Sequence, residues 1–579
     1  MKEAIPMKKL ISLLLILCML PVYAFAAGES MPYITPPSSS TQPSQPAQPT
    51  HTHTPLPTST QLPARTAQPA ATQQPSQASQ RPHIDQPLTQ RAPVRTSQPD
   101  SYNWYEIFVW SYQDSDGDGI GDFNGVRQRL DYIADMGYTG IWFMPIMPSP
   151  SYHKYDVTDY KAVDPQYGTM EDFRALVSEC HEKGIRVIID LPVNHTSTRH
   201  PWFLSAVESI QKRKFDSPYL DYYCFTETPS GNKYVKVSGS SWHYEEQFAG
   251  GNMPDLNLHS EAVLAEIRDI ISFWLTDVDV DGFRLDAVTS FHAADVAENV
   301  ATLDKIKAMC EELKPGSYVV GEAWVGQSAL AEYWQSTVDS FFLFPSSQAE
   351  GFIVKSVLGR SPDATKYVKG LETALSLLPE GRVLAPFLCN HDTGRSIGLL
   401  QARTLPERAK FAQGLLGMMP GNVFTYYGDE IGMVGAGDDP NKRLAMYWND
   451  GDMTTQPPGV TKIEYAYPCV DDQLADPGSL LNYCKAVNHA RLRSPLIARG
   501  LNTTLYSDKN VVLMKRELDG ECCYIAINFA KSAANTVEIS ATGLTIVSDL
   551  VALDGNATLA ENDGVTTVTL PPYGIAVIE

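Results

Sequence analysis

The sequence is short of positive charge. Its 45 Lys and Arg residues are outnumbered by 67 Asp and Glu residues, so the 579-residue chain has a formal net charge of −22. Nucleic acids and anionic membrane surfaces are polyanions, and this charge balance argues against both as partners. The balance suits a protein that handles neutral ligands or cations, although acidity also promotes solubility by itself.

Cysteine is sparse and is not arranged in metal-binding pairs. The chain has nine cysteines, none of them in a C-x-x-C pair, and Cys522 is directly followed by Cys523. Adjacent residues on a strand point to opposite faces, so these two do not form a joint site. The spacing gives no zinc signature and no disulfide framework. One or two disulfides remain open for a chain outside the cell.

No apolar run is long enough for a comfortable membrane span, which needs about 20 residues. The run from Leu10 to Leu20 is preceded by Lys8 and Lys9 and followed by an A-x-A site ending at Ala26. This order is typical of a cleavable signal peptide, so we predict a leader over residues 1–26 and a secreted protein without a membrane span.

Large apolar residues are nearly absent from residues 27–101, which are rich in Pro, Ser, Thr and Gln. Such a segment cannot bury enough surface to fold, and we predict an extended, disordered linker. The linker could also hold the folded part at the cell surface.

From residue 102 onward, short apolar runs alternate with amphipathic helical patterns. Eight runs are strand-like: 104–112, 140–146, 185–193, 280–288, 318–324, 340–344, 384–389 and 423–427. Five helical patterns lie between them: 126–136, 170–183, 260–277, 294–313 and 406–419. Continuous apolar runs are typical of strands buried on both faces, and strands that alternate with helices indicate parallel units. We therefore predict an α/β fold, a (β/α)8 TIM barrel over residues 102–494.

Two regions depart from this alternation. Residues 196–258, after the third strand, are aromatic and Gly-rich and predict a small inserted domain over the active face. Residues 495–579 contain short alternating strands, such as 511–516 and 523–528, and predict a C-terminal all-β sandwich domain.

Chemically active side chains stand at the ends of four predicted strands, where barrel enzymes place their catalytic groups. These are Asp190 to His195 after the third strand, Arg284 and Asp286 on the fourth, Glu322 on the fifth, and His391 and Asp392 after the seventh. The fourth and fifth strands are neighbours in such a barrel, so Asp286 and Glu322 should face each other. Any one of these acids could be a simple strand-end cap, but acids and basic partners at four strand ends indicate catalysis.

Two apposed carboxylates are the requirement of retaining glycoside hydrolysis, with a separation of about 5–5.5 Å. Arg284 shares a strand face with Asp286 and should keep it ionised as a nucleophile. Glu322 should stay protonated near neutral pH as the general acid, which requires a raised pKa. Asp392 could stabilise the oxocarbenium-like transition state.

These segments resemble the alpha-amylase family of glycoside hydrolases. The matching runs are D-L-P-V-N-H, G-F-R-L-D-A-V, G-E-A-W and F-L-C-N-H-D, in the family's order, and the resemblance spans about residues 102–579. It implies Asp286 as nucleophile, Glu322 as acid/base and Asp392 as transition-state stabiliser. It implies further sugar-binding residues: Tyr155, Asp156, His195, Arg284, His391, Asp439 and Arg443. Asp438 remains an alternative to Asp439.

The resemblance leaves specificity open. Met253-Pro-Asp-Leu-Asn257 resembles a form intermediate between the oligo-1,6-glucosidase and neopullulanase types. Thr289 and Ser290 stand where many alpha-amylases have Lys-His. The resemblance favours an alpha-amylase acting on an alpha-glucan as a monomer. Alternatives are an exo-acting alpha-glucosidase or oligo-1,6-glucosidase, a neopullulanase-like enzyme, a transglycosylase, and a non-catalytic glucan-binding relative. Four tryptophans are candidates to stack on sugar rings: Trp142, Trp202, Trp242 and Trp324.

A calcium site is predicted in the first barrel loop, D-S-D-G-D-G-I-G-D. Acids alternating with glycines supply hard oxygen ligands, as Ca2+ requires. The predicted ligands are Asp114, Asp116, Asp118, the Ile120 carbonyl and Asp122. The loop is not an EF-hand, because Gly125 stands where a bidentate Glu belongs. A solvated Asp/Gly-rich turn is the simpler alternative.

Overall fold

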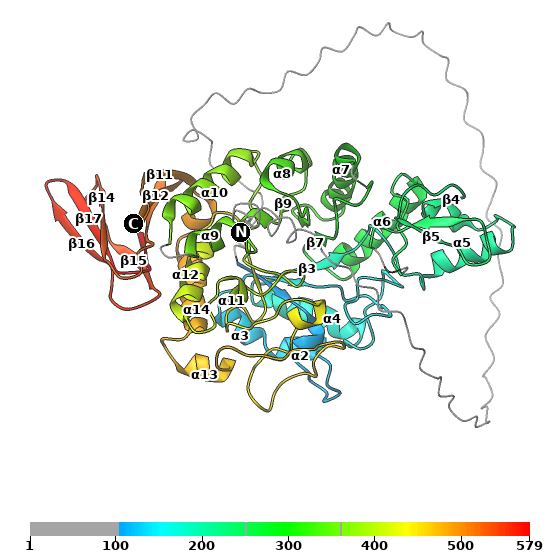
Figure 1. Ribbon diagram of the computed structural model, residues 1–579, viewed down its shortest axis with the longest axis horizontal. Coiled ribbons are helices and arrows are strands. Elements are labelled where there is room, and N and C mark those ends of the chain that lie inside the picture. Colours follow the sequence, from blue (N-terminus) through cyan, green and yellow to red (C-terminus); the bar gives the residue numbers. More distant parts are fainter. Residues whose placement is uncertain (1–102, 249, 251, 294, 359–361) are drawn as a thin grey trace, which may run out of the picture. The chain divides into compact units, whose positions relative to one another are not determined.

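The computed structural model describes residues 103–579 except 249, 251, 294 and 359–361 (Figure 1). The predicted signal peptide (1–26) and linker (27–101) lie outside the described residues.

The central sheet is parallel and has the strand order β10-β1-β2-β3-β7-β8-β9. Its strands are β1 Asn103–Ile107, β2 Gly140–Phe143, β3 Arg186–Leu191, β7 Gly282–Leu285, β8 Tyr318–Gly321, β9 Ser340–Phe341 and β10 Val423–Tyr426. The segment 384–389 lies between β9 and β10 and joins them through parallel bridges, Phe342 to Ala385 and Phe387 to Phe424. The sheet therefore closes on itself with eight members, and the predicted barrel is confirmed.

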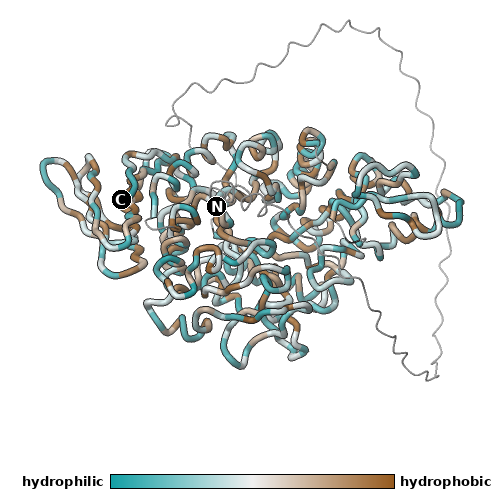
Figure 2. Tube along the Cα trace, in the orientation of Figure 1, coloured by the Kyte–Doolittle hydropathy of each residue, from teal (hydrophilic) through white to brown (hydrophobic). Residues whose placement is uncertain are grey.

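Helices follow most strands and pack around the barrel (Figure 1). They are α2 Phe123–Gln128, α3 Leu130–Asp135, α4 Met170–Glu182, α6 Glu261–Ser272, α7 Val296–Leu313, α8 Gln327–Tyr333, α9 Phe352–Val357, α10 Ala364–Leu377, α11 Ser396–Leu399, α12 Pro406–Gly417, α13 Val470–Ala475 and α14 Leu480–Arg493. The predicted helix 126–136 is broken at Arg129, which has non-helical backbone angles. Hydrophilic and hydrophobic colours alternate along much of the helical part of the chain in Figure 2, and helices such as α4 and α10 bury one face while the other meets solvent. Helix α12 is buried on all sides from Phe411 to Gly417.

The barrel interior is filled with large side chains. Trp104 stacks between Tyr318 and Phe424, with ring centroids 5.2 and 5.7 Å away. Gly140 on the neighbouring strand is required here, since a Cβ at this position would lie 2.5 Å from the Trp104 ring. This layer forms the floor beneath the functional site.

Residues 196–258, which follow β3, fold into α5 Pro201–Gln211, a short 3-10 helix Pro218–Tyr222, and a three-stranded antiparallel sheet. The strands are β4 Phe225–Thr226, β5 Tyr234–Lys236 and β6 His243–Glu245, in the order β4-β6-β5. A backbone bridge from His195 to Asp255 brings the two ends of the insert together, and a second from Tyr223 to Leu256 joins its middle to its last residues. Both ends of the insert thereby lie close to the end of β3.

The C-terminal residues form two antiparallel sheets. The first has the order β11-β12-β13-β18-β15 and the second β14-β17-β16. The strands are β11 Leu501–Ser507, β12 Val511–Leu518, β13 Glu521–Asn528, β14 Asn535–Ile539, β15 Ile546–Val551, β16 Thr558–Asn562, β17 Val565–Leu570 and β18 Gly574–Ile578. Their inner faces share one apolar core, which includes Leu513, Ala526, Val568 and Leu570. The predicted β-sandwich is confirmed.

None of the eight cysteines within the described part forms a disulfide, and six of them are buried. Over the same residues, no helix has the length and apolar character that crossing a membrane requires.

Arg491 on α14 forms hydrogen bonds with the turn between α12 and β10. Its guanidinium donates to the carbonyls of Met419 and Gly421, each at 2.7 Å, and its Nε donates to Asn103 Oδ1 at 2.8 Å. The side chain is fully buried. Because these acceptors have no access to water, Arg491 ties the last barrel helix to the first and last strands.

We expect Arg491→Ala to destabilise the protein by about 3 kcal/mol, because several buried acceptors lose a charged donor. The measurement is the shift of the thermal unfolding midpoint. Arg493→Ala on the same helix is the matched control, since Arg493 is exposed and donates one hydrogen bond to Ser548. Equal shifts in the two variants would show that Arg491 has no special role.

Candidate active site

The ends of the parallel strands bring the predicted acids to one end of the barrel. Arg284 lies on β7, Asp286 follows it, and Glu322 follows β8. The backbone N–H of Glu322 donates to the Leu285 carbonyl at 2.9 Å, which sets the two strand ends in register. Ala287 has a positive φ of 49°, an unfavourable conformation for a non-glycine residue, and its N–H donates to Glu322 Oε2 at 3.1 Å. The turn after Asp286 thus holds Glu322 in place.

The Arg284 guanidinium is fully buried and contacts three carboxylates. Its Nη1 lies 2.8 Å from Asp190 Oδ1 and 2.6 Å from Asp286 Oδ1, and its Nη2 lies 3.1 Å from Glu322 Oε2. Asp286 and Glu322 therefore flank the same cation. A positive charge at this distance favours the ionised form of a carboxyl group.

Glu322 is nevertheless held close to neutrality. Burial raises its pKa to about 7, with further increases from the negative charges of Asp286 and Asp392, and these outweigh the lowering by Arg284. Glu322 is therefore suited to donate a proton near pH 7, as a general acid must.

Asp392 lies next to two cationic side chains, and its pKa is lowered where that of Glu322 is raised. His391 Nε2 lies 2.9 Å from its Oδ2, and Arg443 Nη2 lies 2.9 Å from its Oδ1. Burial by itself would raise the pKa of Asp392, but His391 and Arg443 hold it well below its usual range. Asp392 therefore stays ionised beside the protonatable Glu322.

His391 is a cation in this arrangement. Burial opposes its charge, yet Asp392 and Glu106 raise its pKa to about 9. Glu106 Oε1 lies 2.6 Å from His391 Nδ1, and the Glu106 side chain is fully buried on β1. No sequence motif predicts a role for Glu106, although an acid inside a largely apolar strand is a signal for a buried partner.

Tyr155 forms a wall of the site. Its ring stacks on His391, with centroids 5.5 Å apart and planes at 18°, and its hydroxyl donates to Asp190 Oδ2 at 2.9 Å. Asp190 begins the D-L-P-V-N-H run, and the sequence alone predicts no role for it. It holds both Arg284 and Tyr155, and is a positioning residue behind the cavity.

The acids open into a cavity of about 380 Å³. It is lined by His153, Tyr155, His195, Phe248, Met253, Asp286, Ala287, Thr289, Ser290, Glu322, Trp324, Asp392, Asp439 and Arg443. The three predicted catalytic acids and four of the predicted sugar-binding residues share this cavity. Arg284 and His391 are fully buried behind it. Burial lowers the pKa of His195, which makes it a neutral hydrogen-bonding group in the wall.

Asp156 does not line the cavity, although the resemblance implies a sugar-binding role. Its carboxylate accepts a hydrogen bond from Ser149 Oγ at 2.6 Å and another from Ser151 Oγ. Both serines belong to the same loop as Asp156, so its carboxylate stabilises that loop. Asp439 does line the cavity, and Asp438 instead precedes the short helix that carries Asp439 and Lys442.

Of the four tryptophans considered for sugar stacking, only Trp324 lines the cavity, and it is 47% exposed. Trp142 is buried in the barrel floor, where Arg284 lies 5.3 Å from its ring centre. Trp202 packs against Tyr160, Tyr219 and Tyr222, and Trp242 against Phe215. The sequence does not distinguish a tryptophan that packs in the barrel floor or in the inserted domain from one that lines the cavity.

The predicted calcium loop brings three carboxylates together: Asp114, Asp116 and Asp122 have oxygen atoms within 4.8 Å of one another. Asp122 also caps α2 by accepting from the Gly125 N–H at 2.8 Å. Asp118 instead accepts from the Ile120 N–H at 2.7 Å. The donor set of three hard oxygens fits Ca2+.

Comparison with known proteins agrees with this geometry. The alpha-amylase catalytic-domain family profile matches residues 106–500. Alpha-amylase 3 of Dictyoglomus thermophilum is 36% identical over 435 residues, which cover 73% of this chain and 84% of that protein. The rat amino acid transporter heavy chain SLC3A1 is 30% identical, covering 74% of this chain and 70% of that protein. The solved structure of Eubacterium rectale Amy13B has a TM-score of 0.78 and 40% identity, covering 85% of this chain and 97% of that one.

The fold and the site define a barrel glycoside hydrolase. The chain belongs to the alpha-amylase family.

The raised pKa of Glu322 predicts a limit on activity at alkaline pH. The protonated fraction of Glu322 falls as pH rises through about 7, so kcat/KM for a glucan should fall about tenfold for each further pH unit. The measurement is a pH profile of kcat/KM. An aryl glycoside with a good leaving group needs no proton donor for formation of the glycosyl-enzyme. With this substrate, the kcat/KM profile of Glu322→Gln should therefore show no fall at alkaline pH. An unchanged fall in the variant would assign the titration to another group.

Proposed function

We propose that the protein is a secreted alpha-amylase that hydrolyses alpha-1,4-glucosidic bonds in starch and related alpha-glucans with retention of configuration. The observation that carries the proposal is the contrast between three acids in one cavity. Burial raises the pKa of Glu322 to about 7, Asp392 is held ionised by His391 and Arg443, and Asp286 is ion-paired with Arg284. One proton donor beside two anions is what a double displacement at a sugar needs.

In the proposed reaction, Asp286 attacks the anomeric carbon while Glu322 transfers its proton to the departing glycosidic oxygen. The bond to that oxygen breaks and a covalent glycosyl–Asp286 ester forms. Glu322, now a carboxylate, takes a proton from the incoming water, whose oxygen displaces Asp286 from the sugar. Asp392 stabilises the positive charge on the sugar ring in both transition states.

The surroundings of Trp324 favour attack within a chain over attack at its end. Trp324 lines the catalytic cavity and also a neighbouring groove of about 780 Å³. Its ring stacks on Phe344, with centroids 4.7 Å apart, and both rings face that groove. A groove that continues beyond the acids can accommodate a glucan that extends past the bond to be cleaved.

Exo-acting and branch-specific activities remain the second candidate, and the composition of the wall favours them. Thr289 and Ser290 line the cavity in place of the Lys-His pair, and Met253 from the intermediate-type segment lines it too. A non-catalytic role is the candidate from another class. The presence of all three acids in one cavity supports catalysis over that role.

We also propose that the loop at residues 114–122 binds Ca2+ through Asp114, Asp116 and Asp122, with Asp118 and the Ile120 carbonyl as further ligands. A bound Ca2+ would neutralise the repulsion between these acids and cross-link the loop. Thr455, from the segment before α13, donates two hydrogen bonds to the Gly119 carbonyl, each at 2.7 Å. The loop is thereby attached to a distant part of the chain.

The products of soluble starch and pullulan test the activity. We expect early mixed maltooligosaccharides from starch, and no product above background from Asp286→Asn, because the nucleophile is lost. A matched control is Asp472→Asn, an exposed acid on α13 away from the cavity lining. Glucose alone would indicate an exo-acting alpha-glucosidase, and panose from pullulan a neopullulanase. Equal activity of wild type and Asp286→Asn would contradict the proposed mechanism.

Removal of calcium tests the loop. A calcium-selective chelator should lower the thermal unfolding midpoint of the wild type, because Ca2+ binds the folded loop in preference to the unfolded chain. Asp116→Ala should lower the midpoint in calcium and make it insensitive to the chelator. A chelator that has no effect on the wild type would argue against the site.

A further inference from the structure

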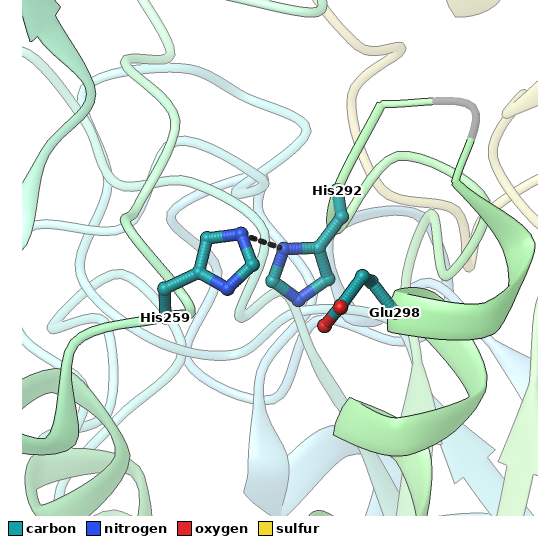
Figure 3. A group of neighbouring side chains, drawn as sticks. All are labelled: His259, His292 and Glu298. Atoms are coloured by element: carbon teal, nitrogen blue, oxygen red, sulfur yellow. Dashed lines mark hydrogen bonds between the residues drawn. The ribbon is translucent and has the colours of Figure 1, made fainter.

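A second group of metal-ligating side chains lies outside the acids and the calcium loop. His259 lies between the inserted domain and α6, His292 lies in the loop between β7 and α7, and Glu298 lies in the first turn of α7 (Figure 3). One ligand atom from each of the three lies within 4.8 Å of the other two. Two parts of the chain, the segment before α6 and the stretch from the loop after β7 into α7, thus present donors to one point.

The two imidazoles face each other through ring nitrogens. His259 Nε2 lies 3.1 Å from His292 Nδ1, and Figure 3 shows the Glu298 carboxylate beside this pair. Two imidazole nitrogens bound to one tetrahedral Zn2+, each at about 2.0–2.1 Å, lie about 3.3 Å apart. The observed nitrogen separation is therefore close to that of two ligands sharing one ion.

The second nitrogen of His292 is already engaged. His292 Nε2 lies 2.7 Å from Thr302 Oγ1, one turn further along α7 than Glu298. A hydrogen bond on the far nitrogen fixes the ring orientation and directs the other nitrogen toward the ligand, as in metal-bound histidines. Thr302 is buried, so this orientation is set by the fold.

We propose that His259, His292 and Glu298 bind one divalent transition-metal ion of the Zn2+ class, and that this ion ties the loop after β7 to the segment that leaves the inserted domain. Imidazole ligands select such ions over Ca2+ and Mg2+, which prefer oxygen ligands. Three protein ligands leave a fourth position for water. The ring centroids lie 4.2 Å apart, so the exposed His259 ring turns outward slightly to seat the ion.

The site is connected to the catalytic cavity through Asn299. The backbone N–H of His292 donates to Asn299 Oδ1 at 2.8 Å, and Asn299 Nδ2 donates to the Thr289 carbonyl at 3.2 Å. Thr289 lines the cavity. An ion that restrains His292 therefore also restrains Thr289 in the cavity wall, three residues after Asp286.

The test is Zn2+ binding to the full-length protein with excess Ca2+ present, so that the calcium loop stays filled. Metal analysis after dialysis should find one Zn2+ per chain in the wild type and one fewer in His259→Gln and in His292→Gln. Thr302→Val should weaken the affinity about tenfold, because the ring orientation is lost. Zn2+ should raise the thermal unfolding midpoint of the wild type by about 2 °C and that of the ligand variants by less.

Two controls separate this site from other histidines and acids. His489→Gln removes a histidine whose Nε2 donates one hydrogen bond to the Asp135 carbonyl, and Asp116→Ala alters the calcium loop. Both should keep the full Zn2+ content. Equal Zn2+ content in the wild type, His259→Gln and His292→Gln would overturn the proposal, as would a wild type that retains no Zn2+. In those cases the imidazoles simply share a hydrogen bond.

Discussion

The site depends on a single buried cation. Arg284 is surrounded by Asp190, Asp286 and Glu322, with the Trp142 ring beneath it, and no water reaches its guanidinium. Without that charge, three carboxylates would repel one another in a medium of low polarity, and each would take up a proton or move apart. With it, Asp286 and Glu322 stay close enough to act on one bond, and Asp190 holds the guanidinium in place from behind. The closed barrel is what makes this possible, since four strand ends supply the groups and the aromatic floor excludes solvent.

The acids that line the cavity do not have the same cationic neighbours. Asp392 has His391 and Arg443 as further cationic neighbours, whereas Glu322 has mainly Arg284 and two anions. The protonation states therefore differ although the residues line one cavity, and the division of roles follows from which cations lie next to which acid. Glu106 contributes from the barrel wall by keeping His391 charged. The protonation states of the acids that line the cavity thus depend on buried ion pairs behind them, such as Glu106 with His391.

The sequence predicted the barrel, the inserted domain and the β-sandwich, because buried parallel strands have long apolar runs and sandwich strands alternate. It placed strand ends too late: the first predicted strand runs to Tyr112, but β1 ends at Ile107. Phe108, Val109, Trp110 and Tyr112 beyond this strand end stay apolar because they are buried in the hydrophobic core, so hydropathy does not mark the end. The five predicted helical patterns leave out α5, α8, α9, α10, α11, α13, α14 and the short helix Leu496–Arg499. The three acids stand in strand-end motifs, whereas Glu106 and Asp190 act through contacts with His391, Arg284 and Tyr155 that depend on tertiary structure. The pairing of His259 with His292 joins segments 33 residues apart, which periodicity does not reveal.

The unpaired cysteines have a consequence for the order of events when the chain folds. Burial raises the pKa of the Cys389 and Cys484 thiols well above the usual value, so in the folded protein they are almost never thiolates. Oxidation and disulfide exchange proceed through the thiolate, so the native core shields these sulfurs from oxidants. An unfolded chain has no such shield. For a protein exported as we propose, collapse of the barrel must therefore outpace thiol oxidation, and slow folding in an oxidising compartment would trap cross-linked chains that cannot close the barrel.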